Sequence, residues 1–375
     1  MTETRIERSA VGDWWWSLDR TTLAALSILA FAGIVFLMAG SPAVAARLHY
    51  STFHFVSRQL VFLLPAFAVM MAISLLSLRM IRRLALIIYI VSFILILLAF
   101  EYGPMLNGAH RWLMIGGVSI QPSEFIKPAF VVLTAWGFAE GARRTDMPGS
   151  FLALILLPLT IVPLVLQPDF GQTMLLAAVW CCLVFTAGLH IVWVLGLGGA
   201  GLVGVAVAYE FLPHVQARID RFLDASSGGN FQVDSALRSF SEGNWFGVGL
   251  GEGVVKRYLP DGHTDFIFAV IGEEFGVVVC LALVAVFAFI VLRGLVLARK
   301  SGNTFCRLAV TGLVTLFGLQ ACINMMVNVH LMPAKGMTLP FISYGGSSLL
   351  SLAIAMGFLL ALTRRRLSLE LYGDE

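Results

Sequence analysis

The sequence predicts an all-α polytopic membrane protein with ten transmembrane helices and both termini in the cytoplasm. Of its 375 residues, 59% are hydrophobic and only 13% are charged, whereas soluble domains average about 45–50% and about 25%. Apolar runs long enough to cross a bilayer recur along the chain, and arginine and lysine concentrate in alternate connections. Too few polar side chains remain to cover a water-exposed surface, and a net charge of +3 does not suggest a nucleic-acid partner. These observations exclude soluble enzymes and nucleic-acid-binding modules.

Ten apolar runs carry the prediction of ten helices, because a bilayer core about 30 Å thick needs roughly 20 apolar residues per helix. The fifth and sixth runs are nearly continuous, and Pro168 and Asp169 supply the turn between them. The chain thus divides into a cytoplasmic tail (1–20), a membrane domain (21–366) and a second cytoplasmic tail (367–375). The runs lie near 21–40, 55–76, 84–100, 121–139, 150–166, 169–187, 191–210, 266–298, 304–330 and 346–363.

Basic residues orient these helices, because cytoplasmic loops of membrane proteins are enriched in lysine and arginine. With both termini inside, fifteen basic residues fall on the cytoplasmic side and four fall in the short outer loops. Trp14, Trp15 and Trp16 precede the first run, as interfacial anchors commonly do. The inner set is Arg5, Arg8, Arg20, Arg79, Arg82, Arg83, Arg143, Arg144, Arg293, Arg299, Lys300, Arg307, Arg364, Arg365 and Arg366; the outer set is Arg47, Arg58, Arg111 and Lys335.

One long hydrophilic segment, 211–264, connects helices 7 and 8 and is therefore expected on the outer face. It is rich in glycine, serine, aspartate and arginine, and 243–253 is a glycine-rich stretch. Connections of this length in a compact protein are usually either functional or disordered. The sequence leaves both interpretations open.

Ionisable residues collect near the expected outer ends of the helices, although a charge in the hydrocarbon region costs about 2.5–3.5 kcal/mol on insertion scales. Glu124 and Lys127 are three residues apart and share a helix face, and Asp169 and Gln172 repeat that spacing. If these faces converge, they form a polar pocket open to the outside. The remaining candidates are Arg111, His263, Asp265, Glu273 and Glu274.

Structural interpretations of these charges stay open beside the functional one. Glu124 and Lys127 could be a buried ion pair that holds two helices together. Glu273 and Glu274 could cap neighbouring backbone or pair with a lysine or arginine.

A polar glycine- and serine-rich turn precedes the last apolar run and provides a candidate anion site. Free N–H groups at a helix N-terminus favour anions, so this turn and Lys335 could hold a phosphate at the outer face. Simple capping of the last helix is the alternative. The candidates here are Lys335, Ser343, Gly345, Gly346 and Ser347.

Seven motifs, in order along nearly the whole chain, resemble the SEDS family (shape, elongation, division and sporulation) of polytopic peptidoglycan glycosyltransferases. The form of the last motif and the start of the chain are similar to division-type members from alphaproteobacteria. The motifs are NGAHRW, QPSEFIKP, QPDFGQ, RIDRFLD, GVGLGEG, LPDGHTDFIFAVIGEEFG and KGMTLPFISYGGSS.

The resemblance implies the ten-helix SEDS fold and an enzyme that polymerises lipid II into β-1,4 glycan strands, with release of undecaprenyl diphosphate. It also implies a class B penicillin-binding protein as the septal transpeptidase partner, other division proteins, and a place in the bacterial inner membrane at the division septum. A divalent cation, Mg²⁺ or Mn²⁺, could assist, held by carboxylate oxygens, and the sequence does not fix its ligands.

Within this resemblance, the catalytic aspartate of the family maps onto Asp265. Displacing a lipid diphosphate with a sugar hydroxyl needs a base near the hydroxyl and positive charge near the diphosphate. Asp265 is the expected base, and an N-cap of the eighth helix is its structural alternative. The expected substrate-binding residues are Arg111, Glu124, Lys127, Asp169, Gln172, His263, Lys335, Ser343, Gly345, Gly346 and Ser347.

Two other functions would suit part of the pattern. A flippase for a lipid-linked precursor would need charged residues along the whole membrane depth, whereas here they cluster outward. A non-catalytic scaffold that recruits the septal transpeptidase would not need acids within the membrane, so it explains Lys127 and Asp265 least well.

Overall fold

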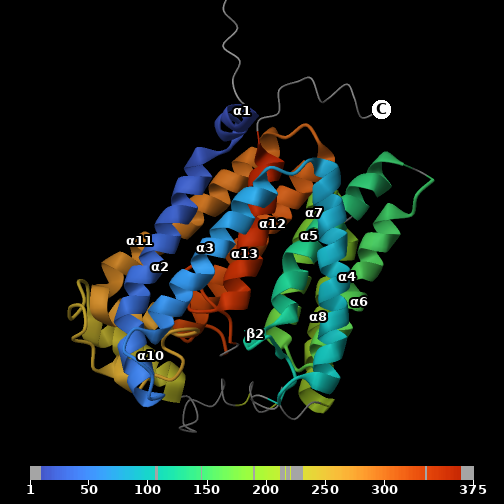
Figure 1. The fold of residues 1–375 in the computed structure, drawn as a ribbon. Coiled ribbons are helices and arrows are strands. Elements are labelled where there is room, and N and C mark those ends of the chain that lie inside the picture. Colours follow the sequence, from blue (N-terminus) through green and yellow to red (C-terminus); the bar gives the residue numbers. More distant parts are fainter. Residues whose placement is uncertain are drawn as a thin grey trace, which may run out of the picture.

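The computed structural model describes residues 10–105, 109–144, 146–188, 191–211, 216, 220, 231–333 and 336–364. Within these residues, ten long helices run alternately up and down the molecule (Figure 1). They are α2 (Arg20–Arg47), α3 (His54–Ser74), α4 (Leu78–Tyr102), α5 (Pro122–Arg143), α6 (Gly149–Leu166), α7 (Phe170–Thr186), α8 (Ile191–Phe211), α11 (Ile267–Lys300), α12 (Thr304–Asn328) and α13 (Gly346–Thr363).

Each predicted apolar run coincides with one of these helices, and the bounds differ mainly at charged ends. The helix expected at 84–100 begins at Leu78, so Arg82 and Arg83 belong to its first turns. Long basic side chains can extend from a helix end toward water. The helix is therefore longer than the apolar run that predicts it. The helix expected at 21–40 continues through Pro42 to Arg47.

Seven of the described helices are long and apolar enough to cross a membrane: α2, α3, α4, α6, α11, α12 and α13. Helix α7 is apolar but has 17 residues. Helix α5 carries Glu124, Lys127, Glu140 and Arg143, and its first turns are among the most buried in the molecule. The buried charged side chains of α5, Glu124 and Lys127, therefore lie only in its first turns, and the two ends of the helix differ in role.

The two ends of the helix bundle differ in chemistry. The short helix α1 (Ala10–Ser17) lies at one end, together with the last turn of α13, and α10 (Phe231–Gly243) lies at the other (Figure 1). We call these the α1 end and the α10 end. The described residues of the predicted inner basic set all come from the α1 end: Arg20, Arg79, Arg82, Arg83, Arg143, Arg144, Arg293, Arg299, Lys300, Arg307 and Arg364.

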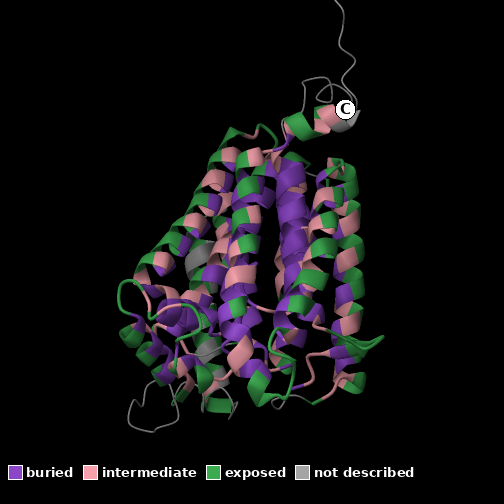
Figure 2. Ribbon diagram, turned by 60° about the vertical axis from the view of Figure 1, so that its left-hand side comes forward, coloured by how far each residue is buried: buried purple, intermediate pink, exposed green. Residues whose placement is uncertain are grey.

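Helices α5, α12 and α13 each contain many buried residues. Figure 2 shows that buried residues gather on helices inside the bundle, whereas the outer helices carry more exposed ones. Helix α13 packs against α3, α5 and α12. Only 28% of the apolar stretch of each of α3, α4 and α6 is buried, and large hydrophobic side chains on all three are exposed, which suits contact with lipid chains. Polar residues on the central helices are therefore shielded from lipid by the outer ones.

A two-stranded antiparallel hairpin departs from the all-α expectation. Strands β1 (Leu113–Ile115) and β2 (Val118–Ile120) pair directly before α5. The turn between them consists of Gly116 and Gly117, whose φ angles are 58° and 78°. Positive φ at both central residues defines the tight turn that matches strand twist, and glycine adopts it without a steric penalty. The hairpin fixes the direction in which the chain enters α5.

The 211–264 segment holds regular structure in its described part: helix α10 and the short 3₁₀ helix η1 (Val255–Arg257). Its glycine-rich stretch packs against a break in α11 at Gly276, where φ is 80° and ψ is 173°. The Val248 N–H donates to the Glu273 carbonyl at 2.9 Å, and the Val277 N–H donates to the Asn244 carbonyl at 3.0 Å. Thus the loop supplies the backbone partners that the break removes from the helix.

Candidate functional site

Asp265 lies at the α10 end, directly before α11, and its backbone is held by two amides of α12. The Asn324 Nδ2 group donates to the Asp265 carbonyl at 2.9 Å, and the Asn328 Nδ2 group donates to the same carbonyl at 2.9 Å. The Asn324 amide also reaches the Met337 carbonyl at 2.6 Å. These bonds fix the backbone of Asp265 and leave its carboxyl unconstrained by them.

Asp265 is half-buried as a residue, and protein surrounds its carboxyl closely. Burial, followed by the nearby charges of Asp261 and Glu124, raises the pKa of Asp265 to about 7. His263 behaves in the opposite way, since burial and the charge of Arg47 lower the pKa of its imidazole to about 4. Near neutral pH, Asp265 can therefore accept a proton, whereas His263 is a neutral ring.

His263 anchors the segment before Asp265 to the turn that precedes α13. Its ring centroid lies 4.3 Å from that of Phe55, and its carbonyl accepts from the Tyr344 N–H at 3.0 Å. The Ser343 hydroxyl donates to the Thr264 carbonyl at 2.5 Å. The predicted residues His263 and Ser343 thus hold two loops together, whereas the imidazole Nδ1 of His263 is buried without a hydrogen-bond partner among the described residues.

Glu124 and Lys127 form a buried ion pair on the first turns of α5. Lys127 Nζ lies 2.9 Å from Glu124 Oε2, and the two side chains are only 2% and 6% exposed. Lys127 Nζ also donates to Gln320 Oε1 at 3.0 Å, and Gln172 Nε2 donates to Glu124 Oε1 at 2.7 Å. We call these four residues the Lys127 cluster. It joins α5, α7 and α12 at the α10 end.

Asp169 and Arg111 lie beside the Lys127 cluster. Arg111 donates from Nε to the Gln167 carbonyl at 2.9 Å and from Nη2 to the Pro168 carbonyl at 2.5 Å, so it fixes the turn between α6 and α7. Asp169 interacts electrostatically with Arg111 and with the cluster. Within the described residues, Asp169 Oδ2 and Gln172 Oε1 are buried acceptors without a hydrogen-bond partner. Two such acceptors, three residues apart at the start of α7, could receive hydroxyl groups of a ligand.

Gln320 connects the Lys127 cluster to the loop beside Asp265. Its Nε2 group donates to the Thr338 carbonyl at 3.2 Å, and the Thr338 and Ser348 hydroxyls lie 2.7 Å apart. In the same loop, a Cβ atom added to Gly336 would lie 3.5 Å from Asp265 Oδ2. The predicted pocket residues from α5, α7 and α11 thus converge at one end of the bundle.

The turn before α13 retains backbone N–H groups at the start of a helix. Gly345 precedes the first turn, no side chain caps it, and Gly346 begins the helix. The Ser347 hydroxyl accepts from the Gln121 N–H at 3.1 Å, so this side chain joins the turn to α5. Its role toward a phosphate, like that of Gly345 and Gly346, stays a prediction. Lys335 lies outside the described residues.

Glu273 and Glu274 make the structural contacts that were considered beside a functional role: one accepts from backbone N–H groups and the other pairs with a lysine. Glu273 Oε1 accepts from the Val255 N–H at 2.7 Å, and its Oε2 accepts from the Lys256 N–H at 2.8 Å. Glu274 forms a buried ion pair with Lys256. Both acids therefore fasten η1 to α11 and lie outside the Lys127 cluster.

Sequence reasoning missed Gln320, Asn324, Asn328 and Thr338. The three amides occupy every fourth position of an otherwise apolar helix, so they share one face. That spacing was the available signal. It was overlooked because neutral amides carry no charge to mark them in an apolar run.

Metal ligands are not grouped in the described part of the chain, where no three His, Cys, Asp or Glu side chains are placed to hold one ion. Mg²⁺, however, is commonly bound through one or two carboxylates and the phosphates of a substrate. That second arrangement needs only one or two carboxylates from the protein, and the α10 end offers single ones such as those of Asp169 and Asp265. The predicted divalent cation thus stays an expectation.

The fold and the site together define a class: a polytopic helical membrane protein with a buried ionisable cluster and a poised carboxyl at one end. A family model described as "Cell cycle protein", which covers FtsW, RodA and SpoVE, matches residues 19–367. The chain therefore belongs to this family, the SEDS family that its motifs resemble.

Curated relatives extend over almost the whole chain. It is 43% identical over 364 residues to "Probable peptidoglycan glycosyltransferase FtsW" of Caulobacter vibrioides, which covers 96% of this chain and 93% of the relative. A protein of the same name from Saccharophagus degradans is 34% identical over 369 residues and covers 96% and 95%.

Solved structures share the fold. One, described as "Structural coordination of polymerization and crosslinking by a peptidoglycan synthase complex", superimposes with a TM-score of 0.77 at 25% identity and covers 93% of this chain and 98% of its own. The rod shape determining protein RodA of Thermus thermophilus gives a TM-score of 0.68 at 26% identity and covers 93% and 97%.

Proposed function

We propose that this protein is a peptidoglycan glycosyltransferase that joins lipid II disaccharides into β-1,4 glycan strands during cell division and releases undecaprenyl diphosphate. The observation that carries the proposal is Asp265, a half-buried residue at the α10 end whose pKa is raised to about 7 beside a cluster of buried charges. Two curated relatives that span the chain are named as peptidoglycan glycosyltransferases of the FtsW type.

The proposed reaction is an inverting displacement in which Asp265 acts as general base. Its carboxylate takes the proton of the acceptor 4-hydroxyl while that oxygen bonds to the anomeric carbon of the donor sugar. The bond from that carbon to the diphosphate breaks, and the electron pair leaves with undecaprenyl diphosphate. A base with a pKa near the working pH is suited to this transfer, which typically contributes about 10²–10⁴-fold.

Positive charge must then meet the leaving diphosphate. Lys127 is already paired with Glu124, so its net contribution is smaller than that of an isolated lysine. Arg111, Lys335 and the backbone N–H groups of 345–347 are the proposed additional partners. A divalent cation bound to the diphosphate oxygens would supply further positive charge for the leaving group.

The buried acceptors at the start of α7 suit substrate hydroxyls. Asp169 Oδ2 and Gln172 Oε1 lack partners within the described residues, and sugar and peptide portions of a lipid-linked precursor carry many donors. We assign these two residues to headgroup binding.

We further propose ten membrane passes, with the α1 end in the cytoplasm and the α10 end outside. Support comes from the ten alternating helices and from the basic residues gathered at the α1 end. The cytoplasmic tails would be 1–20 and 367–375, around a membrane domain of 21–366. The catalytic end would face outward in the bacterial inner membrane, with enrichment at the division septum.

The proposed partner is a class B penicillin-binding protein, which would crosslink the strand, within a set of other division proteins. A solved relative is part of a peptidoglycan synthase complex of polymerisation and crosslinking. Depletion of the protein should give filamentous cells without septa if the role is division. Rounded cells that still divide would instead indicate elongation.

The direct test is glycan polymerisation by the purified protein supplied with lipid II, with and without the transpeptidase. Asp265→Asn should abolish polymer while the thermal unfolding midpoint stays unchanged, because asparagine keeps the size of the side chain and the N-cap residue of α11 is Phe266, without a side-chain cap. Near-normal polymer from Asp265→Asn would end the base assignment. Transfer of lipid II across vesicles without polymer would favour the flippase, and neither activity would favour the scaffold.

A further inference from the structure

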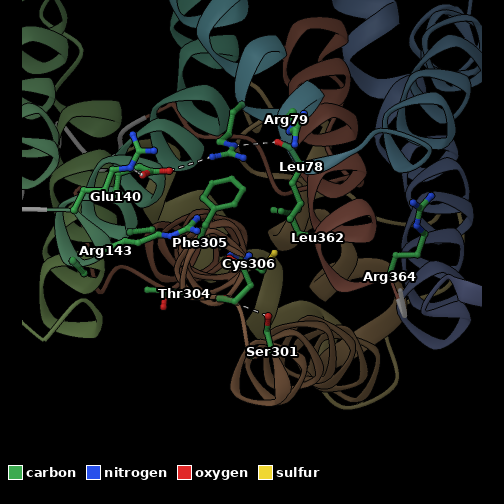
Figure 3. A pocket seen from close by; sticks show the side chains of 16 residues that line it. Leu78, Arg79, Glu140, Arg143, Ser301, Thr304, Phe305, Cys306, Leu362 and Arg364 are labelled. Carbon is green, nitrogen blue, oxygen red and sulfur yellow. Dashed lines mark hydrogen bonds and ion pairs between the residues drawn. The ribbon is translucent and has the colours of Figure 1, made fainter. Parts of the chain in front are cut away.

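A cavity of about 930 Å³ opens at the α1 end of the bundle, and Figure 3 shows the side chains that line it. Asp265 lies at the opposite end. It lies between the start of α4, the end of α5, the start of α12 and the end of α13. Glu140 is the one acidic side chain among its described lining residues. Five arginines line it: Arg79, Arg82, Arg143, Arg144 and Arg364.

Glu140 is engaged within the wall of the cavity. Its Oε1 lies 3.3 Å from Arg82 Nη1 and accepts from Trp136 Nε1 at 3.2 Å. Its Oε2 lies 3.9 Å from Arg144 Nε. The described lining thus carries five guanidinium groups and one carboxylate, so its formal charge is positive.

Arg82 is preorganised by contacts on several sides. Its Nε donates to the Leu78 carbonyl at 3.4 Å. Its guanidinium lies 5.6 Å from the ring centroid of Trp136 and 5.4 Å from that of Phe305. A fixed guanidinium loses little rotamer entropy when it binds a further anion. By contrast, Arg143 is exposed and forms no ion pair or hydrogen bond with the described residues.

The remaining walls combine apolar and weakly polar surface. Phe305 and Leu362 are buried and form an apolar part of the lining. Helix α12 begins here at Thr304, and the Asn303 side chain caps it by accepting from the Cys306 N–H at 3.2 Å. The positive end of the helix dipole therefore adds to the charge of the arginines.

We propose that this cavity binds the phosphodiester headgroup of an acidic phospholipid from the leaflet at the α1 end. Guanidinium groups match phosphate oxygens in a bidentate way. The cavity lies at the ends of helices that are apolar enough to span a membrane. In a bilayer, the ends of such helices lie at the depth of the lipid headgroups. The apolar part of the lining suits the glycerol and the first acyl carbons.

A general excess of basic residues at a cytoplasmic face explains their number, but it does not require them to converge. Arg83 and Arg299 lie at the same end, are exposed, and do not line the cavity. Arg79 and Arg143 come from different helices and approach one cavity, on different sides of Phe305 (Figure 3). The two pairs of arginines carry the same charge and differ in whether they line the cavity. Comparing them therefore distinguishes binding in the cavity from the general effect of basic residues at this end.

The test measures binding of labelled phosphatidylglycerol to the full-length protein in phosphatidylcholine nanodiscs. The double variant Arg79→Gln/Arg143→Gln should raise the Kd at least about tenfold, since each basic residue near an anionic surface contributes severalfold. The matched control Arg83→Gln/Arg299→Gln should stay within about twofold. If the first double variant does not fold, Arg143→Gln alone should still raise the Kd about threefold.

Three outcomes would overturn the proposal. One is equal binding of phosphatidylglycerol and labelled phosphatidylcholine, and another is equal loss of affinity in the two double variants. The third concerns competition: soluble glycerol 1-phosphate would displace the labelled lipid at the same concentration as unlabelled phosphatidylglycerol does. That result would identify a soluble anion as the occupant. Failure of glycan polymerisation would leave all three measurements unaffected.

Discussion

At the scale of single residues, the ionisation of Asp265 should determine the acid limb of the pH profile, where kcat/KM falls as the pH is lowered. Burial and the charges of Asp261 and Glu124 raise the pKa of Asp265 to about 7. The base form is the deprotonated one, so kcat/KM should rise with pH and level off above about 7. One unit below the pKa, only about a tenth of the carboxyl is ionised, and the rate should fall in proportion. Polymerisation measured between pH 5 and 8.5 tests this expectation.

Asp261 offers a control for that profile. It is exposed, and its charge contributes to the raised pKa of Asp265. Its φ angle is 52°, a conformation that asparagine also tolerates. Asp261→Asn should therefore move the acid limb to lower pH while the plateau rate is kept. His263, whose pKa is about 4, contributes nothing above pH 5. An unmoved limb in Asp261→Asn would assign the titration to another group.

The Lys127 cluster can be dissected with a double-mutant cycle. Removing one partner of a buried pair typically costs about 3–5 kcal/mol, because the other charge is left without compensation. Lys127→Met and Glu124→Gln should each destabilise the protein, and the double variant should recover much of that loss. If Lys127 also binds the diphosphate, the double variant should remain poorly active. Thermal unfolding and polymerisation on the same preparations measure both quantities, and recovery of both would reduce the pair to a structural role.

At the scale of elements, the break in α11 depends on close backbone approach at one glycine. A Cβ atom at Gly276 would lie 2.4 Å from the Trp245 carbonyl oxygen, in a region of φ and ψ that glycine alone occupies readily. Gly276→Ala should cost about 1–3 kcal/mol from backbone strain and more from the clash. The thermal unfolding midpoint in detergent should fall accordingly.

Gly251 supplies the matched comparison. Its φ angle is 88°, yet a Cβ atom there would meet nothing within 4 Å. Gly251→Ala therefore carries the backbone cost without the collision, and it should lower the midpoint less than Gly276→Ala. Equal losses would mean that close approach to the glycine-rich loop does not matter.

The long helices and the acidic and basic candidates could be predicted because hydropathy and charge are local properties of the sequence. The break in α11 could not, since it depends on a loop that packs against it from 27 or more residues earlier in the chain. The roles of Glu273 and Glu274 needed the position of Lys256 for the same reason. Asn324 and Asn328 were missed because their partner is a backbone carbonyl, which leaves no mark on a residue pattern.

At the scale of the whole molecule, the proposed orientation makes opposite ends of the bundle accessible from opposite sides. Ser241 on α10 and Gly302 before α12 are both exposed. In a variant without the five native cysteines, Ser241→Cys should react with an impermeant thiol reagent in intact spheroplasts. Gly302→Cys should react only after the membrane is ruptured. The reverse pattern would overturn the proposed orientation. It would also overturn the proposal that the end with Asp265 meets its substrate outside the cytoplasm.

The interlocking of 244–249 with 273–278 bears on how the nascent chain is inserted. Val277 and Val278 donate to carbonyls of Asn244 and Trp245, so these bonds cross between two stretches of chain. A backbone group left without a partner in hydrocarbon costs several kcal/mol. Because translation proceeds from the N-terminus, the glycine-rich stretch leaves the ribosome before α11 and is available when the broken helix reaches the translocon. A circular permutant that placed α11 ahead of this stretch would reverse that order, and its insertion efficiency would fall although every native contact could still form.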